Sequence, residues 1–317
     1  MRIVIACPAP RGAHSGNRVT AERWRTLLRE LGHVATIDRD AGAGPADLLV
    51  AVHATRSAAA IARFRRRSPR APTIVTLAGT DLYVDLPGAP EAWGALEPAS
   101  RLVVLHPLAA ESLPPGLRDK TRVILQSARA PAAAPPRSRR FFDVAVAAHL
   151  RGVKDPFRAE EAVRGLPSSS RLRVRHAGRV LESGLGREAR RRAAANPRYS
   201  WLGERSGSEA RRLIAGSRLL VVTSRSEGGA NVVSEAVVSG VPVVATRIPC
   251  TIGLLGEGYP GFFEVGDTAG LRRLLLRAEG EPGFLRTLAA WCRGRRPLFA
   301  PARERGAWRR LLGELGL

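Results

Sequence analysis

The residues with the most chemical information form a short segment from Glu227 to Glu235, which follows the apolar run 219–223. β-Favouring residues predict a strand for the apolar run, and residues 231–239 are compatible with a helix. Gly228 and Gly229 lie in the turn between them, where glycine permits a positive φ and the close approach of a ligand to the backbone. The order of strand, glycine turn and helix predicts a phosphate site at the first helical N–H groups and the positive end of the helix dipole.

A glutamate stands at each end of this segment. An ionised carboxylate only accepts hydrogen bonds, so Glu227 and Glu235 are suited to bind hydroxyl groups rather than phosphate. Phosphate at the helix end, with hydroxyl-binding carboxylates on either side, indicates a nucleotide-sugar site. The alternative is an ordinary βα turn with two solvated glutamates.

The length and composition indicate a globular protein of two domains. The 317 residues contain 44% hydrophobic and 5% aromatic side chains, which is typical of an α/β protein. No apolar stretch approaches the roughly 20 residues that cross a bilayer, and residues 1–6 read as a strand rather than a signal peptide. The cysteines Cys7, Cys250 and Cys292 are too far apart for zinc spacing or a disulfide framework. We therefore expect a cytoplasmic protein without an integral membrane segment.

The chain is strongly basic, with 51 Lys+Arg against 28 Asp+Glu and a net charge of +23. Such a balance favours anionic partners. The arginines are spread over predicted helix faces such as residues 63–67, 187–192 and 272–277, and no basic arm is interleaved with aromatic residues for stacking on bases. We expect no nucleic-acid partner, although a basic nucleic-acid-associated protein is the alternative of another class. Lysine occurs only at Lys120 and Lys154.

Short apolar or β-branched runs alternate with helical patterns in both halves, which predicts parallel sheets with helices on both faces. The predicted strands are residues 2–6, 33–37, 48–52, 73–78, 102–105, 122–125, 142–148, 172–176, 199–202, 219–223, 241–245 and 262–265. The predicted helices are residues 19–31, 57–67, 90–99, 158–164, 186–195, 208–215, 231–239 and 270–277.

The proline-rich stretch at residues 128–138 predicts a linker between two Rossmann-like domains. We expect an acceptor-side domain over residues 1–130, a linker over 131–140, and a nucleotide-sugar-binding domain over 141–299. The amphipathic segment at about 300–317 is expected to pack back on the first domain. Open parallel sheets bind ligands at the carboxyl ends of their strands, so we expect the substrates in a cleft between the two domains.

This combination of features resembles the GT-B glycosyltransferases, specifically glycosyltransferase family 4. The resemblance covers the whole chain in architecture and is most specific from Arg225 to Pro242. It implies that Glu235 binds the ribose hydroxyls of the donor and that Glu227 approaches the donor sugar. It also implies that the intervening loop holds the donor diphosphate through Gly228, Gly229, Ala230, Asn231 and Val232.

A second motif follows the first predicted strand of the second half, at residues 149–156. Family 4 carries an arginine and a lysine here that clamp the donor diphosphate. Arg151 and Lys154 match by type, at a shorter spacing than in many members. Two cations at this place neutralise the charge that builds on the leaving group as the glycosidic bond breaks. A solvated basic turn is the alternative.

Three further candidates lie in the first half. The loop after the first strand opens a helix and predicts an acceptor-side anion site formed by Gly12, Ser15, Gly16, Asn17 and Arg18. His53 stands at a predicted strand end, where family 4 enzymes often have a histidine that touches the donor sugar; a satisfied core histidine is the alternative. Asp81 follows another strand end, where it orients a substrate or caps a turn.

A narrower resemblance rests on SGNRVTAERW, HATRSA, LAGTDLY, HLRGVKDPFRA and SEGGANVVSEA. These segments resemble the selenosugar synthases of selenoneine biosynthesis. That group joins selenophosphate to the anomeric carbon of a UDP-N-acetylhexosamine such as UDP-GlcNAc and releases UDP. The resemblance implies no metal and no other cofactor. A conventional family 4 transferase with an alcohol, lipid or glycan acceptor is the main alternative, and a UDP-sugar epimerase is a further one.

Overall fold

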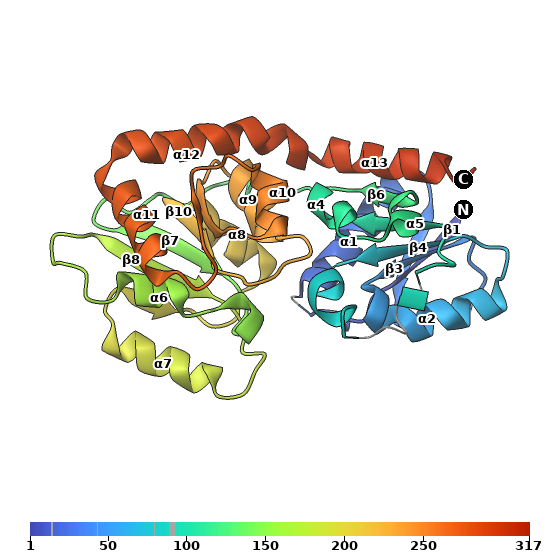
Figure 1. Ribbon diagram of the computed structural model, residues 1–317, viewed down its shortest axis with the longest axis horizontal. Coiled ribbons are helices and arrows are strands. Elements are labelled where there is room, and N and C mark those ends of the chain that lie inside the picture. The colour runs from blue at the N-terminus through green and yellow to red at the C-terminus, as the bar shows by residue number, and fades with distance from the viewer. Residues whose placement is uncertain (14, 43, 79, 89–92, 95) are drawn as a thin grey trace. The chain divides into compact units, whose positions relative to one another are not determined.

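The computed structural model describes residues 1–13, 15–42, 44–78, 80–88, 93–94 and 96–317. These residues form two compact units (Figure 1). The first unit contains Met1–Gln126, Glu227–Gly229 and Pro301–Leu317, and the second contains Ser127–Ser226 and Ala230–Ala300. Within the described residues each unit has a parallel six-stranded sheet with helices around it, which confirms the predicted α/β fold class.

The first sheet has the strand order β2–β1–β3–β4–β5–β6. Its strands are β1 (Arg2–Ala6), β2 (Val34–Asp38), β3 (Leu48–Val52), β4 (Thr73–Leu77), β5 (Arg101–Val104) and β6 (Thr121–Val123). All neighbouring pairs are parallel, so the carboxyl ends of these strands lie along one edge of the sheet. Every residue of β3 and β4 is buried, as expected for central strands of a sheet that is covered on both faces.

Alternating side chains of the central strands divide the core of the first unit into two layers. One layer contains Ile3, Leu48 and Ile74 with side chains of α1 (Gly16–Glu30) and α13 (Pro301–Gly313). The other contains Val4, Leu49 and Val75 with side chains of α2 (Ala54–Arg67). This alternation is the period of two that a buried strand requires.

The helix boundaries in the first unit differ in part from those predicted. Helices α1 and α2 each begin three residues earlier than expected, because Ser15 and His53 accept hydrogen bonds from the first turn and act as N-caps. The sequence did not predict η1 (Asp81–Asp85), α4 (Pro107–Glu111) or α5 (Pro115–Arg118). Of the helix expected at residues 90–99, residues 90–92 and 95 lie outside the described residues.

Helix α13 is attached to the first unit by a buried aromatic and polar contact. The rings of Trp24 and Trp308 meet edge to face with centroids 4.9 Å apart. Trp24 Nε1 donates a hydrogen bond of 2.7 Å to Glu304 Oε1, and Arg23 Nε lies 3.2 Å from Glu304 Oε2. Because Glu304 is 2% exposed, these two donors satisfy a carboxylate that would otherwise be buried at high cost. Residues 301–317 therefore complete the core of the first unit.

The second sheet has the strand order β12–β11–β10–β7–β8–β9, and its neighbouring pairs are parallel as well. Its strands are β7 (Phe142–Ala147), β8 (Leu172–Ala177), β9 (Tyr199–Trp201), β10 (Leu219–Val222), β11 (Val243–Thr246) and β12 (Phe262–Phe263). Six predicted runs correspond to these strands, each within two residues at either boundary.

Helices of the second unit contact different strands of its sheet. Strands β8 and β9 are contacted by α6 (Arg158–Val163), α7 (Leu185–Ala195) and α11 (Thr268–Gly280). Strands β7, β10 and β11 are contacted by α8 (Gly207–Ala215) and α9 (Asn231–Val238). The unit also contains η2 (Gly152–Lys154), η3 (Arg296–Phe299), α10 (Pro249–Leu255) and α12 (Pro282–Arg295). The sequence did not predict α10 or α12.

In the described part of the chain, no helix combines the length and the apolar character that a membrane span requires.

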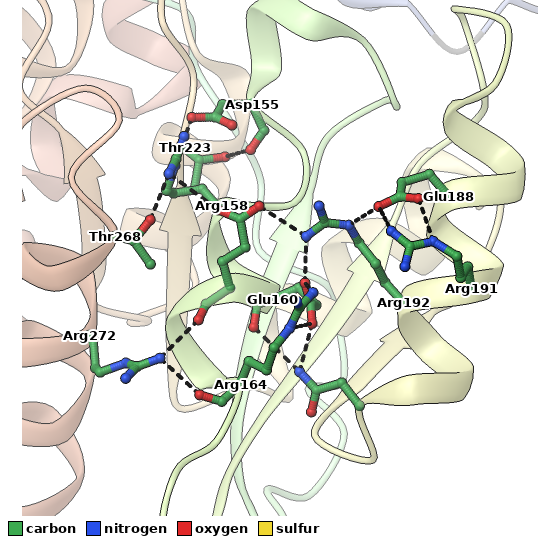
Figure 2. Close-up of polar contacts among 12 residues, drawn as sticks. Asp155, Arg158, Glu160, Arg164, Glu188, Arg191, Arg192, Thr223, Thr268 and Arg272 are labelled. Carbon is green, nitrogen blue, oxygen red and sulfur yellow. Dashed lines mark hydrogen bonds and ion pairs between the residues drawn. The ribbon is translucent and has the colours of Figure 1, made fainter.

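A network of arginines and glutamates connects α6, α7 and α11 (Figure 2). Its centre is Glu160, a fully buried side chain that accepts hydrogen bonds from Arg164 (2.7 Å), Arg192 (2.7 Å) and Asn196 (2.9 Å). Burial by itself raises the pKa of this carboxyl, but the hydrogen bonds from Arg164, Asn196 and Arg192 outweigh it, so the pKa lies below its ordinary value. Glu160 is therefore held in its charged form inside the protein.

We predict that Glu160→Gln lowers the free energy of unfolding of the second unit by about 3 kcal/mol. Breaking a buried ion pair typically costs about 3–5 kcal/mol. We expect the lower value because one partner, Arg164, is exposed to solvent. Since folding lowers the pKa, the stabilisation is present above the unfolded pKa of about 4.3 and is lost as the pH falls below it. Denaturant unfolding over a pH series measures both effects.

The matched control is Glu257→Gln, which removes an exposed partner of Arg247 and should change stability by less than about 1 kcal/mol. Equal losses from the two substitutions would contradict the central role of Glu160.

Candidate functional site

The loop that carries Arg151 and Lys154 follows β7 and is attached to the end of β10. Thr223 Oγ1 lies 2.8 Å from the carbonyl oxygen of Lys154 and 3.0 Å from that of Asp155, so its hydroxyl is shared between them. The N–H of Arg225 donates to the carbonyl of Val153 at 2.8 Å. Figure 2 shows Thr223 beside Asp155. The predicted motif at 149–156 is therefore joined by hydrogen bonds to the residues that follow β10, at the carboxyl ends of neighbouring strands.

Local backbone geometry sets the shape of this loop. Residues 152–154 form the 3₁₀ turn η2, which ends at Asp155 in the left-handed conformation (φ 44°, ψ 58°). Aspartate tolerates this conformation better than most residues. The N–H of Gly152 donates to Glu182 Oε2 at 2.8 Å, and Arg151 Nε lies 3.7 Å from Glu182 Oε1. The Arg151 side chain is 34% exposed, so its guanidinium is accessible to an anion.

Helix α9 starts directly after the glycine turn. Its N-cap is Ala230, which has no side chain able to satisfy the first N–H groups, and its first turn contains no acidic residue. The N–H of Ala230 itself donates to Cys250 Sγ at 3.4 Å. A helix start without a side-chain cap or an acidic residue is suited to an anion. Glu235 lies one turn further along α9, where it is mostly buried and 3.9 Å from Arg211 Nη1.

Gly229 does not use the positive φ that glycine permits. Its φ lies outside the left-handed region, and the reason for glycine here is steric. Within the first unit, a Cβ at this position would lie 2.6 Å from Leu105 Cδ1 and 3.1 Å from Gln126 Oε1. Glycine is thus required by close packing of the backbone rather than by the conformation of the turn.

In the first unit, His53 stands between two aspartates at the junction of β3 and α2. Its Nδ1 lies 3.2 Å from Asp81 Oδ1, and its Nε2 lies 3.3 Å from Asp85 Oδ2. The backbone of His53 has a φ of 75°, which is uncommon for a residue other than glycine. The ring is 1% exposed, so it is fixed by its neighbours. Strained backbone of this kind is often found at functional positions.

Asp81 holds the start of α2. It is fully buried, and its carboxylate accepts hydrogen bonds from the N–H of Ala54, from the N–H of Thr55 at 3.2 Å and from Thr55 Oγ1 at 2.8 Å. A carboxylate at a helix N-terminus also interacts favourably with the helix dipole. These contacts fix the Asp81 carboxylate, which in turn lies against the ring of His53. Asp85, on the other side of the ring, is 26% exposed and therefore more accessible to solvent.

One group of possible metal ligands occurs among the described residues, and it is this same cluster. The ligand atoms of His53, Asp81 and Asp85 lie within 4.8 Å of one another. The hydrogen bonds from α2 already use both oxygens of Asp81, which fits an ion-pair cluster better than an open coordination site. The expectation that the protein uses no metal stays a prediction.

The sequence analysis missed His106, which follows β5 and is fully buried. Its Nε2 lies 3.3 Å from the hydroxyl of Tyr83, and the two rings stack with centroids 6.1 Å apart. Its Nδ1 and Thr76 Oγ1 have no hydrogen-bond partner within the described parts of the chain. Burial lowers the pKa of His106 to about 4, so the ring is neutral at physiological pH. The sequence could have indicated His106 in the same way as His53, because both histidines follow an apolar strand.

The start of α1 differs from that of α9, because its first turn has a side-chain cap that occupies one N–H group. Ser15 caps the helix by accepting a hydrogen bond of 3.3 Å from the N–H of Arg18, and Gly12 has a φ of +81°. The Arg18 side chain is ion-paired with Glu22 and is buried, and its Nε has no hydrogen-bond partner among the described residues. The first turn, which includes Gly16 and Asn17, contains no acidic residue. This helix start therefore offers N–H groups and a buried guanidinium.

The structure brings the first-unit candidates to neighbouring places on one sheet edge. The loop after β1 carries residues 12–18, His53 follows β3, Asp81 follows β4 and His106 follows β5. These four strands are consecutive neighbours in the sheet. In the second unit, Arg151 and Lys154 lie beside the segment that leads to α9. Glu227 groups with the first unit and Glu235 with the second.

Comparison with known proteins identifies the fold. Residues 152–278 match the family described as Glycosyl transferases group 1, and no curated protein sequence matches the chain. Anabaena Alr3699/HepE, solved with UDP and glucose, aligns with a TM-score of 0.79 at 16% identity over 99% of this chain and 100% of that chain. Sucrose-phosphate synthase from Thermosynechococcus elongatus gives 0.76 at 16% identity, over 99% and 98%. A glycosyltransferase from Rickettsia africae gives 0.77 at 13% identity, also over 99% and 98%.

These alignments show that the chain has the GT-B fold. Residues 152–278, which are less than half of the chain, are similar to the family model of group 1 glycosyltransferases. That segment contains Lys154 and the whole turn–helix region from Glu227 to Glu235. The GT-B fold is thereby confirmed and the resemblance to group 1 is supported over residues 152–278, whereas the roles of individual site residues stay predictions.

We predict that His106 stays uncharged down to about pH 5, because its pKa is lowered to about 4 by burial. Folding favours the neutral ring, so its contribution to stability is present above the unfolded pKa of about 6.5 and is lost as the pH falls toward 4. Side-chain NMR of ¹⁵N-histidine-labelled protein measures the titration, and His106→Gln identifies the signal. A midpoint near the ordinary value would show that the ring is accessible to water.

Proposed function

We propose that this protein is a glycosyltransferase that uses a UDP-sugar as its donor. The observation that carries the proposal is the attachment of the Arg151–Lys154 loop to the end of β10 by Thr223, directly before the segment that leads to α9. The group 1 family match over residues 152–278 supports the same activity. UDP as the nucleotide is supported by Anabaena HepE, which shares the fold and was solved with UDP and glucose.

Each donor-side residue has a role that its chemistry permits. Lys154 and Arg151 neutralise the negative charge that grows on the diphosphate as the bond from the sugar C1 to oxygen breaks. Gly228, Gly229, Asn231 and Val232 provide backbone N–H groups for the phosphates, whereas the N–H of Ala230 donates to Cys250 Sγ. The carboxylate of Glu235 accepts hydrogen bonds from the ribose hydroxyls, and that of Glu227 accepts them from the donor sugar.

We further propose that the acceptor is selenophosphate and that the donor is UDP-GlcNAc. The motifs shared with the selenosugar synthases of selenoneine biosynthesis support this acceptor. The selenium lone pair would attack C1 and form a C–Se bond, while the C1–O bond breaks and its electron pair leaves with UDP. An anionic acceptor suits the start of α1, where the first turn has no acidic residue and the buried Nε of Arg18 has no described hydrogen-bond partner. Water would later cleave the P–Se bond.

One observation favours an alcohol acceptor instead. His53 lies 3.2 Å from Asp81 and 3.3 Å from Asp85, and an imidazole held beside carboxylates is a side chain that can act as a general base. An alcohol needs a base to remove its proton, whereas the selenium of selenophosphate is already a strong nucleophile. This alternative keeps the same UDP-sugar donor and changes only the second substrate.

We predict that Lys154→Ala weakens UDP binding about tenfold or more, because a hydrogen bond to a charged group contributes about 1.5–3 kcal/mol. Isothermal titration calorimetry measures the affinity. The matched control is Lys120→Ala, the one other lysine, which binds the carbonyl of Leu96 in the first unit. We expect this control to bind UDP as the wild type does. Unchanged affinity in Lys154→Ala would remove lysine from the donor site.

We predict that the protein releases UDP from UDP-GlcNAc when selenophosphate is added, and that mass spectrometry detects the selenosugar. Orthophosphate is the matched control, because it is a comparable anion without the selenium nucleophile, and glycerol represents alcohol acceptors. Release with glycerol alone would support the alcohol alternative. Conversion of the sugar to its epimer without UDP release would indicate an epimerase.

A further inference from the structure

The second unit contains a pocket of about 440 Å³ beside α8 that the donor site does not use. Side chains of β7, β8, α8 and the proline-rich stretch at residues 135–138 line it. None of Arg151, Lys154, residues 228–232 or Glu235 belongs to this lining. The volume lies within the usual range for small-molecule sites.

Four arginines line this pocket: Arg173, Arg175, Arg205 and Arg212. Arg173 is paired with Asp143 through two hydrogen bonds of 2.7 and 3.1 Å. Across the part of the chain that the structure describes, no carboxylate lies within ion-pair distance of the other three arginines. Three guanidinium groups without acidic partners thus line one pocket.

The two acidic side chains of the lining are already engaged. Both oxygens of Asp143 accept from Arg173, so this pair has no net charge. Glu209 belongs to the capping box of α8, where its Oε2 accepts from the N–H of Ser206 at 2.9 Å and from Ser206 Oγ at 2.7 Å. Glu209 keeps its own negative charge, but the four arginines of the lining outnumber its two carboxylates, so the pocket has a net positive charge.

The strand pattern explains why arginine lies here. In β8, Leu172, Val174 and His176 are buried on one face, whereas Arg173 and Arg175 alternate with them and are only half-buried. Asp143 is the register partner of Arg173 on β7. The arginines therefore lie on the face of β8 opposite to its buried residues, a polar face that the alternation of the strand produces.

Apart from Ser138 and Gly216, the rest of the lining is apolar and consists of Pro135, Pro136, Leu202 and Leu213. Guanidinium groups bind phosphate through several parallel N–H donors, and they repel one another when no anion is present. We propose that this pocket binds a small metabolite that combines a phosphate or diphosphate group with an apolar or ring portion. The phosphate would bind Arg175, Arg205 and Arg212, and the remainder would lie on the proline and leucine side chains.

Titration calorimetry with inorganic pyrophosphate tests this proposal on the full chain. The pocket variant is R175Q/R205Q/R212Q. The matched control is R187Q/R286Q/R293Q, which removes the same charge from exposed arginines outside the lining. All chains are also measured in a Lys154→Ala background, so that binding at the donor loop does not contribute. We expect the pocket variant to bind pyrophosphate about tenfold more weakly or worse, and the control to stay within about twofold of wild type.

Equal losses in the two triple variants would show an effect of net charge alone and would overturn the proposal, as would unchanged binding in the pocket variant. A single-stranded oligonucleotide is titrated in parallel. If the pocket variant lost oligonucleotide binding but still bound pyrophosphate as the wild type does, the pocket would be assigned to nucleic acid instead. Thermal unfolding checks that each variant folds, and R205Q/R212Q, at two exposed positions, is the substitute if the triple variant does not.

Discussion

The hydroxyl of Thr223, shared between the carbonyls of Lys154 and Asp155, is the contact on which the donor side depends. In a parallel sheet all strands end at the same edge, but that arrangement alone leaves the loops free to diverge. Thr223 and the N–H of Arg225 join the loop after β7 to the end of β10. The two cations of that loop are therefore held beside the segment that leads to α9. The buried network around Glu160 supports the same region, because Arg158 of α6 binds both Asp155 and Thr268.

In the first unit, too, the candidate residues follow the carboxyl ends of parallel strands, but their side chains are of different types. Side chains at the helix starts determine what a ligand would meet there. The start of α1 carries the buried Arg18, whose Nε has no hydrogen-bond partner among the described residues and could bind an anion. Asp81 caps α2 and fixes His53, which brings carboxylate and imidazole to the next strand end. The two proposed acceptors would thus use neighbouring groups: an anion would bind at the start of α1, and an alcohol would bind near His53.

Strands were the features that the sequence predicted best, because buried runs such as residues 48–52 and the alternating residues 172–177 carry their own pattern. Helix starts were displaced where a cap such as His53 is not a usual capping residue. The steric need for Gly229 and the capping role of Asp81 could not be predicted, because each depends on residues distant in the sequence. The donor motif was predicted because its glycines and glutamates are close together in the chain, and its role stays a prediction.

The most direct test of the account is a crystal structure of the protein with UDP bound. The account predicts that the diphosphate contacts Arg151, Lys154 and the first N–H groups of α9, with the ribose hydroxyls on the carboxylate of Glu235. A nucleotide bound elsewhere, with this loop and the start of α9 free of it, would contradict the account.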